Sequence, residues 1–242
     1  MDFARQSKRL SDLLGLRRAP VAVTFRDAAP PAIPRVGVTA AAGCAYWKLA
    51  SEGSVFYTEA ADHYGCPVGA HTHGVDLPPA QAQELQGLIG TMIGLEYLRP
   101  EEIQTIPRRP GRFGVAVYAP LAETPCRPDV VLVRGNARQM MLLAEAAGAA
   151  GLGEAGGAVG RPTCAMIPLA MGRAGWASSL GCIGNRVYTD LGDDEQYFGM
   201  AWAVAPAIVE RLETIVQANR ALEEFHRGRA ASIPSPAPLP RS

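Results

Sequence analysis

Four of the five cysteines occur in two similar phrases. Residues 44–50 read CAYWKLA and residues 164–170 read CAMIPLA, so both fit Cys-Ala-x-x-x-Leu-Ala. A second cysteine follows each phrase after an apolar residue and a glycine, in YGCPVG and in LGCIG. Four thiolates are the ligand set of a [4Fe-4S] cluster or of a structural zinc ion. We therefore expect one site made of Cys44, Cys66, Cys164 and Cys182.

The spacing within each pair favours the cluster over zinc. The two cysteines are 22 residues apart in the first phrase and 18 in the second, whereas structural zinc sites commonly take ligands two to four residues apart. Two alternatives stay open. One is a zinc-stabilised scaffold, and the other is a non-redox protein that binds a small ligand or a tetrapyrrole. In the second case the four cysteines are buried free thiols, because cysteine often packs as a small hydrophobic residue.

Several side chains near the cysteines are candidates to surround a bound group. An aromatic side chain can shield a cofactor from water, a histidine can handle protons, and an arginine can balance negative charge. Each of these types also has an ordinary structural role, in the core, in a backbone hydrogen bond or in an ion pair. The candidates are Trp47, His63, His73, Asn185 and Arg186. Cys126 has no counterpart in the repeated phrases, and we interpret it as a packing thiol.

The similarity between the two phrases extends upstream. Residues 20–26 (PVAVTFR) and 128–134 (PDVVLVR) each run from a proline through an apolar stretch to an arginine, which is typical of a buried strand. We expect an α/β or α+β fold in which two degenerate repeated halves, about 17–100 and 112–200, pack into one domain over 1–230. The Pro/Ser-rich tail, 231–242, is predicted to be disordered.

The remaining pattern predicts the elements that position these residues. Apolar periodicity indicates helices at 2–16, 44–51, 79–97, 136–148 and 204–228. Strands are expected at 112–118 and 128–134, side by side, and residues 149–160 are expected to form a flexible loop. In the helix at 79–97, glycines at 87, 90 and 94 share a stripe that usually marks close approach of another backbone. That contact is either internal or part of a homodimer.

Composition excludes several classes of function. The net charge is zero and no basic run is long, so we expect no nucleic-acid partner and no membrane anchor. The chain lacks a phosphate-binding P-loop, a G-x-G-x-x-G turn after a strand, a G-x-S-x-G elbow and an H-E-x-x-H helix. No signal peptide is recognisable, which predicts a cytoplasmic protein with reduced cysteines. A redox partner protein or a small-molecule ligand is the expected partner.

The same stretches resemble a known family. GCAYWKLA, FYT, DHYGCPVGAHTHG, RPTCAMIPLAM and SLGCIGNRVYT occur in this order and are similar to the domain-of-unknown-function family numbered 169, which is found in bacteria and archaea. The resemblance spans about residues 5–228. It carries the motif cysteines over to Cys44, Cys66, Cys164 and Cys182, but it implies no activity. The cluster is predicted from ligand chemistry and from the repeated phrases.

Overall fold

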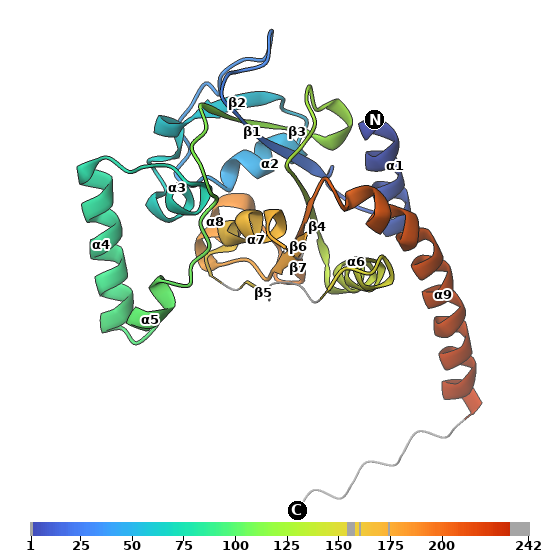
Figure 1. Ribbon diagram of the computed structural model, residues 1–242. Helices are drawn as coiled ribbons and strands as arrows, with labels where there is room; N and C mark the ends of the chain where they lie inside the picture. The colour runs from blue at the N-terminus through green and yellow to red at the C-terminus, as the bar shows by residue number, and fades with distance from the viewer. Residues whose placement is uncertain (1, 154–157, 160, 174, 233–242) are drawn as a thin grey trace, which may run out of the picture.

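The computed structural model describes residues 2–153, 158–159, 161–173 and 175–232. Helices and strands mix along the chain, as the sequence predicts, and build an α/β structure around one sheet (Figure 1). The strand order is β2-β3-β1-β4-β7-β6-β5. All neighbours are antiparallel except β5 and β6, which pair in parallel over two residues. The strands are Val21–Arg26 (β1), Phe56–Glu59 (β2), Val115–Pro120 (β3), Val130–Asn136 (β4), Ala158–Val159 (β5), Trp176–Ser179 (β6) and Glu195–Ala201 (β7).

Helices cover both faces of the sheet. The α-helices are Phe3–Leu14 (α1), Ala45–Ser51 (α2), Pro67–His73 (α3), Pro79–Gly94 (α4), Pro100–Ile103 (α5), Ala137–Ala149 (α6), Met166–Met171 (α7), Ile183–Thr189 (α8) and Ala205–Ser232 (α9). Short 3-10 turns lie at Ala60–His63 (η1), Leu121–Glu123 (η2) and Thr163–Ala165 (η3). On one face α1, α6 and α9 pack together over the sheet, and on the other α2 and α7 do so.

Alternation along the central strands divides the apolar residues between these two layers. Ala22 joins the core under α1, α6 and α9, whereas Val21 and Val23 join the core under α2 and α7. Such alternation follows from the two-residue period of a strand. Both faces are buried at the start of β1 and β4, where the residues are mainly apolar (VAV and VVLV), and the polar residues lie toward the ends of these strands. Each of the four motif cysteines lies on the side of α2 and α7.

The two predicted strands at 112–118 and 128–134 are correct as strands but wrong as neighbours. They correspond to β3 and β4, and β1 lies between them with an antiparallel partner on each side. The loop between β3 and β4 therefore crosses over β1. Outward from the β1–β4 pair, the sheet continues through β3 and β2 on one side and through β7 and β6 on the other. Local sequence carries no information about this pairing.

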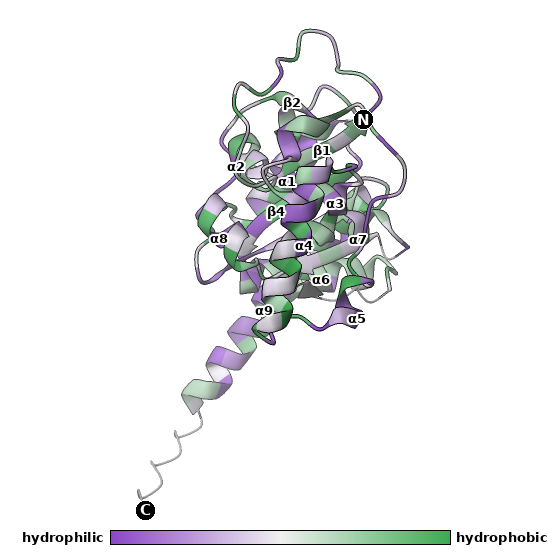
Figure 2. Ribbon diagram, turned by 90° about the vertical axis from the view of Figure 1, so that its left-hand side faces the viewer, coloured by the Kyte–Doolittle hydropathy of each residue, from purple (hydrophilic) through white to green (hydrophobic). Residues whose placement is uncertain are grey.

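The glycines of α4 do not mark a close contact. A side-chain carbon placed at Gly87, Gly90 or Gly94 would meet no described atom within 4 Å. No described residue of α4 is fully buried, and the helix presents Leu88 to solvent. Figure 2 shows α4 on the side of the molecule that faces the viewer. The helix also ends three residues earlier than predicted, at Gly94.

Two predicted irregular segments contain regular structure. Pro67–His73 forms a short helix directly after Cys66, where the Gly- and Pro-rich sequence predicts a loop, and Ile183–Thr189 forms another directly after Cys182, for which we had no expectation. The expected loop at 149–160 includes β5, and its residues 154–157 and 160 lie outside the described part of the chain. The last helix runs four residues beyond its predicted end, to Ser232. Residues 231–232 of the predicted tail are thus helical, and 233–242 lie outside the described residues.

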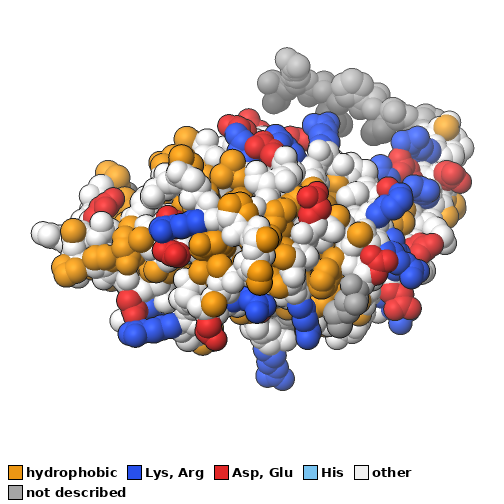
Figure 3. All heavy atoms as spheres, turned by 90° about the horizontal axis from the view of Figure 1, so that it is seen from above, with side chains coloured by type: hydrophobic (Ala, Val, Ile, Leu, Met, Phe, Trp, Pro, Cys, Tyr) orange, Lys and Arg blue, Asp and Glu red, His pale blue; other side chains and the backbone are white. Residues whose placement is uncertain are grey.

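Charges of both signs are interspersed on the surface. Figure 3 shows one face, where Lys and Arg side chains lie beside Asp and Glu side chains and apolar side chains fill the space between them. No helix among the described residues is long and apolar enough to cross a membrane.

Candidate functional site

Four separate segments bring the motif cysteines to one place. Cys44 and Cys66 immediately precede α2 and α3, Cys182 immediately precedes α8, and Cys164 lies in η3 just before α7. The helices that follow them contact one another across the two halves of the chain, α2 with α8 and α3 with η3 and α7. In the first turn of a helix the backbone N–H groups have no partner within the helix. Turns before and around the cysteines pair several of these donors, such as the N–H groups of Ala45 and Tyr46 with the carbonyl oxygens of Ala42 and Gly43.

The four thiols are close enough to influence one another's ionisation. Burial raises the pKa of Cys44 to about 12, and negative charge on Cys66 and Cys182 raises it further. Burial also raises the pKa of Cys164 above its ordinary value, with added repulsion from Cys66, Cys182 and Cys44. Cysteines 120 or more residues apart in the sequence thus share one electrostatic environment. All five cysteines, including Cys126, are free and partly exposed.

Two polar side chains act on these thiols from the opposite half of the chain. The Asn185 amide, on α8, lies beside Cys44 and favours its thiolate. The Thr72 side chain, on α3, likewise favours the thiolate of Cys164, and its hydroxyl donates a 2.9 Å hydrogen bond to the Gly69 carbonyl oxygen. These two interactions oppose the effect of burial but do not cancel it, so the pKa of each thiol stays raised.

Backbone contacts fix the loops that carry the second cysteine of each pair. The backbone N–H of Cys182 donates a 2.6 Å hydrogen bond to the Thr163 hydroxyl. Gly181, just before Cys182, has φ +81°, and a side-chain carbon there would lie 2.4 Å from Leu191. Likewise, a side-chain carbon at Gly65, just before Cys66, would lie 2.7 Å from the carbonyl oxygen of Ala40. Only glycine allows both loops to approach so closely.

Four of the five predicted neighbours are buried at this site, and several of their polar atoms have no partner. Trp47, His63, His73 and Asn185 are at most 1% exposed. The Trp47 indole nitrogen, Nδ1 of His63, both ring nitrogens of His73 and both amide atoms of Asn185 make no hydrogen bond within the described chain. Buried polar atoms are almost always paired. The two histidine rings lie against Gly43, the residue before Cys44, where a side-chain carbon would be 3.4 Å from Nδ1 of His63.

The two histidines form a buried pair. Their ring centroids are 5.5 Å apart, and Nε2 of His63 lies 2.8 Å from the Thr58 hydroxyl. Burial lowers the pKa of His63 to about 4, an effect partly opposed by Asp62. Burial, with His63 and Arg109 nearby, lowers the pKa of His73 to about 3. Both imidazoles are therefore neutral at pH 7.

Arg186 does not face the cysteines with a free charge. Its guanidinium donates hydrogen bonds to the carbonyl oxygens of Gly192 (2.8 Å) and Leu180 (2.6 Å). It thereby ties the loop before Cys182 to the turn after α8. The sequence-based expectation of a structural role describes this arginine better than that of a charge-balancing one.

Sequence reasoning missed three polar side chains of the site. Tyr118 on β3 is fully buried, and the thiols of Cys44 and Cys164 are close enough to add to the rise that burial causes in its pKa. Its hydroxyl has no partner in the described chain. Thr72 and Thr163 are the other two. Thr163 directly precedes Cys164 and Thr72 separates two histidines, so their positions beside motif residues were a usable signal. Tyr118 had none.

The cysteines are not arranged around a single ion. Among the described residues, no three Cys, His, Asp or Glu side chains converge closely enough to hold a metal ion. A zinc ion would draw four thiolates to about 2.3 Å from one centre.

Comparison with known proteins gives one relationship. No curated protein and no solved structure is significantly similar to the chain. The model of one family, DUF169, described as "Uncharacterised ArCR", matches residues 9–211. This match covers every strand, every motif cysteine and all helices except the far part of α9 and the first turns of α1. The chain therefore belongs to the DUF169 family, as the order of its cysteine motifs predicted.

Proposed function

We propose that the protein binds a [4Fe-4S] cluster through Cys44, Cys66, Cys164 and Cys182. The observation that carries this proposal is the mutual proximity of four thiols that come from four segments of the chain. The role of the cluster would be electron transfer, redox sensing or activation of a substrate beside it. A partner in that role is a redox protein or a small molecule, and the proposed compartment is the reducing cytoplasm.

The wide arrangement of the thiols supports a cluster over zinc. A cube of four irons and four sulfides holds its thiolates farther apart than one zinc ion does. The thiols influence one another's pKa, yet they do not converge on a single centre.

The polar surroundings support the same proposal. Hydrogen bonds to ligand sulfurs stabilise the negative charge of a cluster and adjust its potential. The Asn185 amide and the Thr72 hydroxyl already favour the thiolates of Cys44 and Cys164. Burial disfavours ionisation of the Cys44 and Cys164 thiols, and the positive charge of iron would compensate by stabilising their thiolates.

We further propose that the chain is a degenerate duplication with the cluster between its halves. Both halves run in the order strand, cysteine, helix, strand, cysteine, helix, strand, once α4 and α5 in the first half and α6 and β5 in the second are set aside as insertions. The inner, middle and outer strands of the two halves take matching places about the β1–β4 pair. The antiparallel pairing of β1 with β4 is compatible with a twofold relation.

One observation favours a second candidate, a non-redox protein with buried free cysteines. Burial raises the pKa of Cys44 to about 12, so without a metal this thiol is neutral at pH 7. A pocket of neutral thiols and neutral imidazoles could hold an uncharged or tetrapyrrole ligand. The unpartnered atoms of His73 and Trp47 would then bind that ligand.

Purification without oxygen separates the two candidates. The measurements are iron and acid-labile sulfide per chain together with a visible spectrum. About four of each per chain, with broad absorption near ~400 nm, are expected for the cluster. A sharp tetrapyrrole band, or colourless protein with five titratable thiols and no iron after reconstitution with iron and sulfide, would contradict it. If zinc is bound in place of iron, the four cysteines are a metal site, but the proposal of an iron–sulfur cluster is wrong.

A further inference from the structure

A second candidate site lies at the far end of α3 from Cys66. A hollow of about 390 Å³, open to solvent, lies where α3 ends and the segment before β3 passes it. This volume is within the range of small-molecule sites. The lining residues are Gly74, Asp76, Arg108, Arg109, Pro110, Gly111 and Arg112. Three arginines and one aspartate give the lining an excess of two positive charges.

The single carboxylate does not satisfy the arginines. Asp76 accepts from Arg108 at 2.9 Å and from Arg112 at 3.0 Å, so one carboxylate faces two guanidinium groups. Arg109 makes no ion pair with any residue that the structure describes. All three arginines can therefore offer donors to an anion that enters the hollow.

The third arginine is held in place without being neutralised. The Arg109 guanidinium lies 4.6 Å from the centre of the Phe25 ring and 5.1 Å from that of Phe113. It donates to the carbonyl oxygens of His73 (3.2 Å) and Gly111 (3.1 Å). These neutral contacts order the side chain and leave its charge available. An ordered donor loses little conformational freedom when an anion binds.

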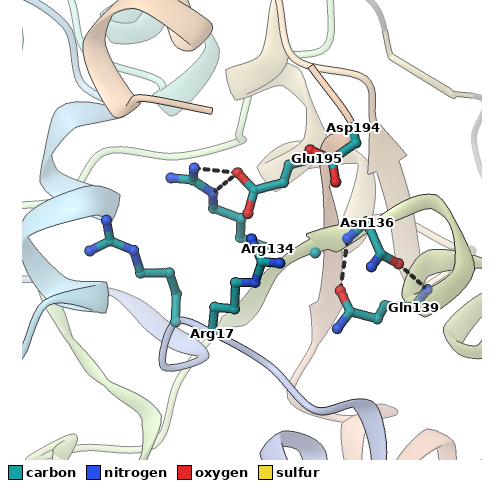
Figure 4. A pocket seen from close by; sticks show the side chains of 8 residues that line it. Arg17, Arg134, Asn136, Gln139, Asp194 and Glu195 are labelled. Atoms are coloured by element: carbon teal, nitrogen blue, oxygen red, sulfur yellow. Dashed lines mark hydrogen bonds and ion pairs between the residues drawn. The ribbon is translucent and has the colours of Figure 1, made fainter. Parts of the chain in front are cut away.

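We propose that this hollow binds a small oxyanion, a phosphate or a carboxylate compound. Guanidinium groups match the paired oxygens of both, and two excess charges suit a dianion. The contrast is the pocket of Figure 4, which combines Arg17, Arg18 and Arg134 with Asp194 and Glu195. There Arg134 is already paired with Glu195, and a carboxylate stands against most of the positive charge.

The position of the hollow connects it to the cysteines. Gly74 ends α3 and Cys66 precedes it, so the seven-residue helix separates the two sites by ~10 Å. A side-chain carbon at Gly74 would lie 2.8 Å from the carbonyl oxygen of Arg109, which shows how tightly the hollow is joined to the end of the helix. The anion would thus be held beside the cysteine site, whatever that site contains.

Calorimetric titration of the full chain tests the proposal. The probes are inorganic phosphate, pyrophosphate and citrate at constant ionic strength, with sodium chloride as the blank. One saturable site per chain is expected, and the order of affinities separates a phosphate site from a carboxylate site. Absence of saturable binding for all three probes would overturn the proposal.

Two substitutions locate the binding. Arg112→Gln and Arg108→Gln should each weaken the binding of the preferred probe at least tenfold. Arg227→Gln is the matched control, because Arg227 is exposed on α9 and also pairs with one carboxylate, that of Glu223. Arg112 is 89% exposed, so its variant should keep the wild-type melting temperature and decides the outcome if Arg108→Gln unfolds. Unchanged binding in Arg112→Gln, or equal weakening in Arg227→Gln, would contradict a site in this hollow. Iron content is measured in parallel, so failure here is distinguishable from failure of the cluster proposal.

Discussion

Burial makes the thiols of Cys44 and Cys164 poor acids, and that fact determines what these two residues can do alone. The pKa of Cys44 is raised to about 12 from an ordinary value of 9.0. At pH 8 its thiolate fraction is then roughly a thousandfold below that of an unperturbed thiol. A nucleophilic cysteine requires the opposite shift. Cys44 therefore suits coordination, where a metal displaces the proton, better than catalysis by a free thiolate.

Substitution of single cysteines distinguishes ligands from packing residues. Changing any one of Cys44, Cys66, Cys164 and Cys182 to Ser should lower iron per chain and the free energy of unfolding together, because cluster binding is coupled to folding. Cys126→Ser is the control, since Cys126 lies in the loop before β4 and should change neither quantity. Iron analysis and thermal unfolding of the five variants provide the measurement. Iron loss in the control, or in only some of the four variants, would count against this ligand set.

The buried histidines predict a dependence of stability on pH. The pKa of His73 is about 3 in the folded protein, against an ordinary value of 6.5. Below pH 6.5 the His73 imidazole is protonated in the unfolded chain but stays neutral in the folded protein. The free energy of unfolding therefore falls as pH falls. Each histidine contributes up to about 1.4 kcal/mol per pH unit in this window.

His73→Phe should remove the His73 part of this dependence. Phenylalanine keeps the ring buried, eliminates two unpartnered nitrogens and cannot be protonated. Between pH 6.5 and 5.0 the variant should lose about 2 kcal/mol less stability than the wild type. The measurement is urea-induced unfolding at both pH values. His226→Gln, at an exposed position on α9, should keep the wild-type slope. An equal slope in His73→Phe would show that His73 is protonated in the folded state.

Residue types and motif spacing predicted the ligand candidates and four of their buried neighbours. They could not predict Tyr118, because an aromatic residue in a buried strand has no local sign of what it faces. They also gave Arg186 two roles without a choice between them. The choice depends on the carbonyl oxygens of Leu180 and Gly192, which only the folded turn brings within reach.

At the scale of elements, the site depends on short helices that begin at cysteines. The helices α3 and α8 are seven residues each and contain glycine, so their sequences lack the apolar period that identified α1 and α6. Tertiary packing stabilises them instead of intrinsic propensity. By contrast, strand β1 was predictable because an apolar run between turn residues is a strong local signal.

Two glycine substitutions compare the site with a helix that has no close neighbours. Gly65→Ala places a carbon 2.7 Å from the Ala40 carbonyl oxygen, so the loop before Cys66 must move. We expect a loss of about 1–3 kcal/mol in unfolding free energy and reduced iron content. Gly90→Ala, on the open face of α4, should instead raise stability by about 0.5–1 kcal/mol. Thermal unfolding and iron analysis of both variants check this.

A contrary result for either glycine has a definite meaning. Wild-type stability and iron in Gly65→Ala would show that the loop before Cys66 is not tightly packed. Destabilisation by Gly90→Ala would show that another surface covers this face of α4 in solution, as a homodimer would. The mass of the wild-type assembly then identifies the second copy.

At the scale of the whole molecule, residues 17–100 and 112–200 each supply two of the four cysteines, so neither segment can form the site alone. Strands β1 and β4 pair at the centre of the sheet, and each half donates a polar group to a thiol of the other. Local patterns predicted the phrases, the strands β1, β3 and β4 and the longer helices in their correct order, but not the strands β2, β6 and β7. The strand order and the crossing between β3 and β4 depend on pairing over long sequence distances, which no local pattern encodes.

The last helix joins the molecule only through its first half, which gives a prediction about truncation. The helix α9 spans 28 residues, and its last fully buried residue is Val216. Beyond it the helix extends away from the body (Figure 1), and Leu222 and Phe225 are more than half exposed. Surface contacts such as Arg138 with Glu223 contribute at most about 1 kcal/mol.

A chain that ends after Glu224 should therefore keep its iron content and unfold within about 0.5 kcal/mol of the full chain, because it retains every core contact of α9. A chain that ends after Arg211, where the family match stops, loses Leu212 and Val216 from the core shared with α6. Removing two such side chains costs about 2–5 kcal/mol each, which is comparable to the whole stability of a domain. Denaturant unfolding of both chains checks the contrast. Equal stability of the two would show that the core between α6 and α9 contributes little, and that the sheet with its cysteine site folds independently of the last helix.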